Sequence, residues 1–291
     1  MPEMFQYGFM LRAMAAGLIV GAVSPTVGLF LVVKRLSLLG EGLSHAAFAG
    51  VAIGWLLGAK PLIAAVIFSA LVAVGIEKLR ARRAAQGDVA LGIMLYASLA
   101  LGLVIMSWSK GLGTEAMGYL FGSIMTVTLF DLVIMLAIGA FVMGTIALLH
   151  KELFVAALDE ESARVSGIPV ERFNLVLVML TAMTVTAAMR VVGTLLVAAL
   201  MVIPVATALQ LNRGFWVTLA CSVGFALAAV FSGLVISFYL DLPPGGAVVL
   251  TAVGLFLAVV AAKRSLQVLL SKLSNDRGRT CKSCCSNHKN Q

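Results

Sequence analysis

Long apolar stretches, separated by short polar turns, fill most of the chain. About 20 apolar residues in a helix span the hydrocarbon core of a bilayer, and nine stretches have about this length. They are residues 8–33, 40–58, 61–79, 89–109, 129–149, 173–189, 191–211, 216–239 and 246–262. The pattern predicts an all-α integral membrane protein with about nine transmembrane helices, and with eight as the alternative count.

One further apolar segment, residues 116–128 with the sequence AMGYLFGSIMTVT, is too short to cross. We expect it to form a half-helix or a re-entrant piece. Unpaired backbone groups are costly in lipid, so such a segment needs a cover of protein or a water-filled cavity.

The composition agrees with a membrane protein. Hydrophobic residues make up 61% of the chain and charged residues 12%, whereas a soluble domain is about 25% charged. The first apolar stretch is too long for the core of a cleavable signal peptide, so we expect it to remain as a span. We expect a membrane domain over residues 1–262, which includes a cytoplasmic loop at 151–172. A basic, cysteine-containing cytoplasmic tail at 263–291 is expected to be disordered.

The basic residues lie mostly on one side of the predicted spans. If the amino terminus is extracytoplasmic, all but four of the 21 Lys and Arg residues fall in cytoplasmic segments. The four exceptions are Arg12, Lys60, Lys110 and Arg190. Because Lys and Arg favour cytoplasmic loops, an outside amino terminus and a cytoplasmic carboxyl terminus are predicted. The net charge of +8 then reflects topology, and no nucleic-acid partner is expected.

Two ionisable residues interrupt the second predicted span, in the stretch GEGLSHAAFAG at residues 40–50. Glu41 and His45 are four residues apart, so a helix places them on one face, one turn apart. Ionisable groups inside a membrane are expensive to bury and usually mark a substrate or ion path. A carboxylate oxygen and an imidazole nitrogen can hold one divalent cation. The alternative is structural, with Glu41 capping the helix start and His45 bonded to a backbone carbonyl.

Small residues recur every four positions along the same span, at Ala46, Gly50, Gly54 and Gly58. Such a stripe lets a neighbouring helix approach closely. We therefore expect the second span to be packed tightly in the bundle, while the face with Glu41 and His45 points inward.

The segment that carries this pair, KRLSLLGEGLSHAAFAGVAIG, resembles the membrane permeases of zinc- and manganese-importing ABC transporters. In that family an acidic residue, often Asp, and a His have this spacing, so Glu41 keeps the charge on a longer side chain. Further similar blocks follow in the same order, and the resemblance covers roughly residues 10–262. These blocks are GDVALGIMLYASLALGLVI at 87–105, YLFGSIMTVT at 119–128, RVVGTLLVAALMVIPVATA at 190–208 and LPPGGAVVL at 242–250.

The resemblance implies a transporter permease of the bacterial plasma membrane, a homodimer that works with two cytoplasmic ATPase subunits and an extracytoplasmic metal-binding protein. It implies that Glu41 and His45 hold the ion transiently, since a site as tight as structural zinc would not release it. Zinc is the first expectation for the ion, with manganese or iron as alternatives, and no permanently bound cofactor is expected. The sequence lacks a GxxxxGK[ST] phosphate-binding loop, so ATP should be hydrolysed on a separate subunit.

The predicted cytoplasmic loop contains a short helix. Asp159 can cap its start, Gly167 can end it, and Pro169 prevents its continuation. The loop resembles the coupling helix of importer permeases, with Asp159, Ala163 and Gly167 in the matching positions, which implies contact with the ATPase. Without the resemblance, the segment would be interpreted as a solvated loop with one helical turn.

Two other features leave alternatives open. Pro204 removes a backbone hydrogen bond within its span and is either a hinge for alternating access or an ordinary kink. Cys281, Cys284, Cys285 and His288 form a CxxCCxxH cluster in the tail, which either binds a zinc-type metal or belongs to a disordered segment.

Two other classes of function would require different residues or partners. An intramembrane metalloenzyme needs further ligands and a base, as in HExxH, whereas His45 is the only His well inside the predicted bundle. An ion-coupled secondary transporter would move metal without an ATPase, whereas an ABC permease is inert until an ATPase is added.

Overall fold

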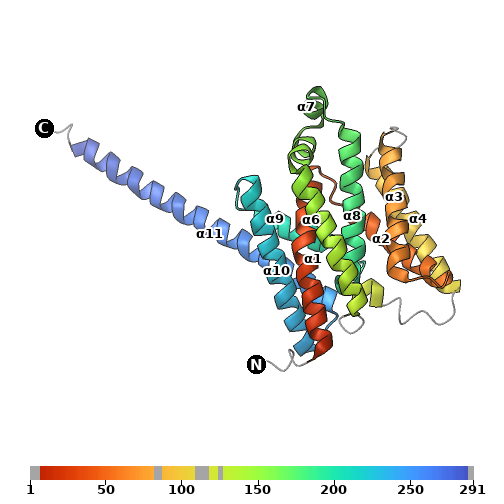
Figure 1. The fold of residues 1–291 in the computed structure, drawn as a ribbon. Helices are drawn as coiled ribbons and strands as arrows, with labels where there is room; N and C mark the ends of the chain where they lie inside the picture. Colours follow the sequence, from red (N-terminus) through yellow and green to blue (C-terminus); the bar gives the residue numbers. More distant parts are fainter. Residues whose placement is uncertain (1–6, 82–86, 109–117, 124–126, 288–291) are drawn as a thin grey trace.

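The computed structural model describes residues 7–81, 87–108, 118–123 and 127–287, excluding the side chains of residues 81, 87–88 and 266–287. Within these ranges the regular structure is helical (Figure 1), which confirms the predicted all-α class. The helices are α1 (Gly8–Val33), α2 (Leu39–Leu56), α3 (Pro61–Ala81), α4 (Gly87–Trp108), α6 (Leu129–Leu158), α7 (Glu160–Val165), α8 (Val170–Val192), α9 (Val197–Leu209), α10 (Phe215–Leu240) and α11 (Pro244–Asn287).

Fewer of the described helices than the nine predicted spans are long and apolar enough to cross a membrane. Seven described helices are long and apolar enough to cross a membrane, namely α1, α3, α4, α6, α8, α10 and α11. α2 has 18 residues, and Glu41 and His45 lower its hydropathy. α9 has 13 residues, about 20 Å at 1.5 Å per residue, which is too short for a hydrocarbon core of about 30 Å.

The predicted span 191–211 is wrong as a continuous helix. Its first two residues complete α8, and Gly193 then has φ +87, which interrupts the helix before α9 begins at Val197. Residues 118–121 form a single helical turn beside this break. The Thr194 N–H donates to the Tyr119 carbonyl at 2.9 Å, and the Ser123 N–H donates to the Arg190 carbonyl at 3.4 Å. The described part of the short segment expected at 116–128 is therefore bonded to the break between α8 and α9, with Tyr119 and Val127 buried and Phe121 exposed.

Helices α1 and α8 are the most buried of the seven candidate spans. In α1 and α8, 72% of the residues in the most apolar window are buried, against 22–33% in α3, α4, α6, α10 and α11. α1 packs against α6, α8, α9 and α10, while α2 packs against α3, α4 and α8. The outer helices leave most of their apolar side chains at least partly exposed, as expected for contact with lipid. α7 lies at the end of the bundle opposite the N-terminus (Figure 1).

Small residues set the contact between α2 and α3. A Cβ added at Gly50 would lie 2.6 Å from Ala65 Cα, and one at Gly54 would lie 2.8 Å from Ala64 Cβ. Gly58 departs from the predicted stripe, because it lies beyond the end of α2 with φ +64 and no atom within 4 Å of an added Cβ. Tight packing of α2 against α3 therefore depends on two glycines.

We expect Gly50→Ala to lower the free energy of unfolding by about 1–3 kcal/mol, because the added methyl group overpacks the contact between α2 and α3. Thermal unfolding in detergent micelles measures the effect. Gly144→Ala in α6 is the matched control, since nothing lies within 4 Å of an added Cβ there. Equal unfolding temperatures for the two variants would contradict the packing argument.

Candidate functional site

Glu41 and His45 lie on α2, which packs between α3, α4 and α8. Glu41 is exposed in the first turn of the helix, whereas His45, one turn further on, is only 5% exposed. The His45 Nδ1 atom is buried and has no hydrogen-bond partner among the described residues. A carboxylate that solvent can reach therefore stands one turn from an imidazole with an unsatisfied nitrogen.

The structural alternative for this pair is not supported by the geometry. Leu38 is the N-cap of α2, and no side chain makes a cap hydrogen bond there, so Glu41 does not cap the helix. Ser44, between the two residues in sequence, donates its hydroxyl to the Glu41 carbonyl at 2.7 Å. A buried polar atom without a partner usually marks strain, a function or an unseen ligand. His45 Nδ1 is such an atom.

Glu41 and His45 together offer few donor atoms, which favours brief binding of a metal ion. Among the described residues no group of three or more His, Cys, Asp or Glu side chains lies close enough to hold a metal ion. One oxygen and one nitrogen donor, with water completing the coordination, bind a divalent ion more weakly than a four-ligand structural site. Such a pair can pass an ion along a path without trapping it.

The short helix predicted within residues 151–172 is present as α7. The Asp159 carboxylate accepts hydrogen bonds from the Glu161 N–H at 2.9 Å and the Ser162 N–H at 3.2 Å. The Ser162 hydroxyl, followed by these two N–H groups, lowers the pKa of Asp159. At the other end Gly167 has φ +80, and the Ile168 N–H donates to the Ala163 carbonyl at 3.0 Å, which closes a Schellman motif.

α7 is anchored on one side and exposed on the other. Ala163 is fully buried and packs with Ala156 of α6 and Val170 of α8. Val165, two residues later, is 87% exposed. Single exposed apolar side chains are common on protein surfaces, so Val165 marks the open face of α7 without by itself indicating a partner. The three residues predicted for ATPase coupling, Asp159, Ala163 and Gly167, thus fix the shape of α7.

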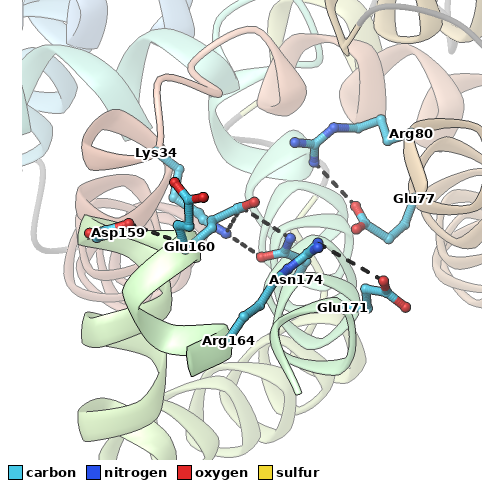
Figure 2. Close-up of polar contacts among 9 residues, drawn as sticks. Lys34, Glu77, Arg80, Asp159, Glu160, Arg164, Glu171 and Asn174 are labelled. Atoms are coloured by element: carbon cyan, nitrogen blue, oxygen red, sulfur yellow. Dashed lines mark hydrogen bonds and ion pairs between the residues drawn. The ribbon is translucent and has the colours of Figure 1, made fainter. Parts of the chain in front are cut away.

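A polar network joins α7 to the end of α1 and to α8, and an ion pair of α3 lies near it (Figure 2). Lys34, at the end of α1, donates to Glu160 Oε1 at 2.8 Å and to Asn174 Oδ1 of α8. The Asn174 amide also donates to Glu160 Oε1, at 3.2 Å. On α3, Arg80 donates to Glu77 Oε2 at 3.2 Å. The Lys34 side chain is 5% exposed and that of Glu160 is 45% exposed, so a buried cation meets a half-exposed carboxylate.

The pKa of Glu160 is lowered. Burial acts to raise it, but the hydrogen bond and charge of Lys34, the Asn174 amide and the charge of Arg80 together outweigh burial. Because the folded-state pKa lies below the ordinary value of 4.5, the pair stabilises the docking of α7 above pH 4.5. This stabilisation is lost as the pH falls through the lowered pKa.

Acidification from pH 7 to pH 3.5 should therefore loosen α7. The effect is at most about 1 kcal/mol, or about fivefold in the opening equilibrium, since solvent screens the half-exposed Glu160. Amide hydrogen exchange of α7, corrected for the intrinsic pH dependence, measures it. In Lys34→Met the contribution of this pair should vanish, which separates it from that of Asp159. Equal pH dependence in the two proteins would refute the assignment.

A buried ion pair, missed in the sequence, lies at the opposite end of the bundle. Arg190 Nη2 of α8 donates to Asp131 Oδ2 of α6 at 2.6 Å, and the Arg190 guanidinium lies 4.9 Å from the Tyr119 ring centroid. Asp131 also completes a capping box with Thr128 at the start of α6. The spacing TxxD before an apolar run could have predicted the capping box at the start of α6. The ion pair with Arg190 could not be predicted, because the two residues are 59 positions apart in sequence.

The remaining predicted residues are placed as follows. Pro204 lies inside α9 and is buried, and the nearby Met201 backbone touches Gly28 of α1, where an added Cβ would have no room. α11 continues through Asn287 without a break at residue 262. The tail residues Cys281, Cys284 and Cys285 lie in this helix, but their side chains and all of His288 are outside the described residues. The hinge, the disorder of the tail and its metal binding stay predictions.

Comparison with known proteins decides the family. The profile of the ABC 3 transport family matches residues 6–263. The chain belongs to the ABC 3 transport family. This ABC 3 permease is 40% identical over 259 residues to a probable metal transport system membrane protein of Treponema pallidum, which covers 89% of this chain and 97% of that protein. It is 32% identical to a manganese transport system membrane protein, MntC, of Halalkalibacterium halodurans, over 87% of each chain.

A solved structure has the same fold. A chain of PsaBC from Streptococcus pneumoniae, in complex with Fab, superposes on the ABC 3 permease with a TM-score of 0.80. The two are 31% identical over 88% of this chain and 92% of that chain. Another relative, from Haemophilus influenzae, is named as the membrane protein of a zinc uptake system.

Membership of the ABC 3 family establishes the type of protein. The chain is the multi-pass membrane permease of a bacterial ABC importer of divalent metal ions, and it is not itself the ATPase. An ABC permease of this type requires an ATPase and a metal-binding protein as partners. A secondary transporter that works without an ATPase is thereby excluded.

Proposed function

We propose that two copies of the permease form a homodimer that passes a divalent transition-metal ion along a path to which each copy contributes Glu41 and His45. The observation that supports this proposal is the buried His45 Nδ1 atom, which has no hydrogen-bond partner in the described part of the chain, one turn from an exposed carboxylate. Burial of an ionisable pair in a membrane protein costs free energy, and such residues usually bind or conduct a substrate ion.

The pair matches the chemistry of such an ion. Carboxylate oxygen and imidazole nitrogen together accept Zn²⁺, Mn²⁺ and Fe²⁺. Because relatives are named for manganese and for zinc, these two ions are the first to compare, with iron third. Few protein ligands favour release, which a path requires.

The end of the bundle that carries α7 is proposed to face the cytoplasm and the ATPase. Lys34, Arg80, Arg164 and Arg172 lie at this end, because α1 and α3 finish there and α8 starts there. Positive residues of this kind favour the cytoplasmic side. The exposed Val165 of α7 then offers an apolar contact to the partner.

Reconstitution tests the proposed function. Purified permease in liposomes should not move metal by itself. Addition of its ATPase and its metal-binding protein should produce ATP-dependent uptake, and the ion that most stimulates ATP hydrolysis among Zn²⁺, Mn²⁺ and Fe²⁺ is the substrate. Equal uptake with and without the ATPase, or stimulation by none of these ions, would overturn the proposal.

A further inference from the structure

Lys34 is a buried cation at the corner between the central helix α1 and the helix that carries Glu41 and His45. Its side chain is 5% exposed, and it contacts Glu160 in the first turn of α7 and Asn174 in the first turns of α8. In a membrane protein Lys residues near a helix end usually extend toward water. Lys34 instead turns into the protein, and its ammonium group has two partners there (Figure 2).

The corner next to Lys34 is rigid. The Arg35 N–H donates to the Val32 carbonyl at 3.1 Å, and the Leu36 N–H donates to the Leu31 carbonyl at 2.8 Å. These bonds form a Schellman motif. Arg35 has φ 58, a left-handed conformation that costs a non-glycine residue free energy. The two hydrogen bonds restrict the freedom of the backbone between α1 and α2.

The rigid corner leads directly into α2. The Leu39 N–H donates to the Leu36 carbonyl at 3.0 Å, so the first residue of α2 is bonded back to the corner. Glu41 lies in the first turn of α2. Lys34 and Glu41 are therefore seven positions apart, and the connection between them is short and closed by backbone hydrogen bonds at Arg35, Leu36 and Leu39.

We propose that Lys34 is the positioning residue that transmits movement of α7 to Glu41 and His45, through its contact with Glu160. The proposal rests on the proposed function, in which the ATPase docks on α7. ATP-driven displacement of α7 moves Glu160, the ion pair carries Lys34 and the corner with it, and α2 shifts the two metal ligands. Asn174 guides the movement because its amide donates to Glu160 while its carbonyl oxygen accepts from Lys34.

Charge reversal tests the link in the complete transporter in liposomes. The readout is the number of metal ions imported per ATP hydrolysed. Lys34→Glu and Glu160→Lys should each lower this ratio at least about tenfold, while ATP hydrolysis continues. The double variant K34E/E160K restores the ion pair with reversed sign, and the Asn174 amide can bond either charge. It should return the ratio to within about threefold of the wild type.

Two further variants keep the test decisive if charge reversal prevents folding. Lys34→Met removes the charge but keeps the aliphatic stem, and it should lower the ratio in the same direction. Lys263→Met is the matched control, because Lys263 reaches only Gln210 Oε1, at 3.5 Å, among the described residues and lies outside this network. The control should retain the wild-type ratio.

The outcomes separate this inference from the proposed function. Wild-type ratios in all Lys34 and Glu160 variants, or no recovery in the double variant, would overturn the transmission role. Loss of ATPase co-purification with Lys34→Met would also overturn it, because Lys34 would then maintain the docking surface. Val165→Asp, in contrast, places a charge on the exposed face of α7. If the ATPase co-purifies normally with Val165→Asp, docking on α7 is wrong whatever Lys34 does.

Discussion

Replacement of His45 by Ala should reduce metal uptake by the reconstituted transporter at least about tenfold. Loss of a single outer-shell partner of a metal ligand already costs about 10–100-fold in affinity or activity, and loss of a ligand itself should cost no less. Glu41→Gln removes the charge with little change in shape and should have a similar effect. Both variants should still assemble with the ATPase, since neither residue contributes to α7. Uptake of the radioactive or fluorescent metal tracer and co-purification of the ATPase measure the two properties.

Ser44→Ala is the control for this prediction. Ser44 lies on α2 between the two proposed ligands, is fully buried, and donates its hydroxyl to the Glu41 carbonyl of the same helix. Its removal should leave uptake within about twofold of the wild type, because a bond within a helix is lost without any metal donor. Wild-type uptake in both His45→Ala and Glu41→Gln would remove the pair from the metal path.

Asp131→Ala should produce the largest loss of stability, about 3 kcal/mol. The side chains of Asp131 and Arg190 are 6% and 15% exposed, and removal of one partner leaves the other charge buried without compensation. Arg190 Nε already lacks a hydrogen-bond partner among the described residues. Without Asp131 the guanidinium would therefore lose its hydrogen bond at Nη2 as well. Thermal or denaturant unfolding in detergent reports the change.

Two comparisons identify the cause of that loss. Arg164→Gln breaks an exposed pair with Glu171, at 4.0 Å and with side chains 60% and 73% exposed, and should cost less than about 1 kcal/mol. The double variant D131L/R190L removes both charges and should recover much of the stability. If Asp131→Ala is as stable as Arg164→Gln, the buried pair has no structural role.

Hydropathy predicted where helices exist, but not where one of them breaks. The run from Val191 to Leu211 is mostly apolar, with only Thr194, Thr207 and Gln210 as polar residues, so its hydropathy does not separate α8 from α9. The break requires Gly193 in a left-handed conformation beside the turn at residues 118–121, and that contact joins segments about 70 positions apart in sequence. Glycine is common in membrane helices, so Gly193 alone did not indicate an end.

The same limit applies to the charged residues. Spacing placed Glu41 and His45 on one helix face, and cap chemistry predicted α7 from Asp159 to Gly167, because both signals are local in sequence. Lys34 was interpreted only as a topology determinant, and Arg190 as one of four extracytoplasmic basic residues. Their partners, Glu160 and Asp131, lie 126 and 59 positions away, and no local pattern reports such a contact.

Helix α8 is held at both of its ends, and the two restraints differ in strength. Asn174 joins it to the half-exposed Glu160 near its start, and Arg190 joins it to the buried Asp131 near its finish, about 24 Å further along the axis. The contact with the half-exposed Glu160 costs less to open than the buried ion pair of Arg190 and Asp131. Because the weaker restraint lies at the start of α8, we expect the start of the helix to be displaced further than its end. The end of α8, at Arg190, should act as the pivot of this movement.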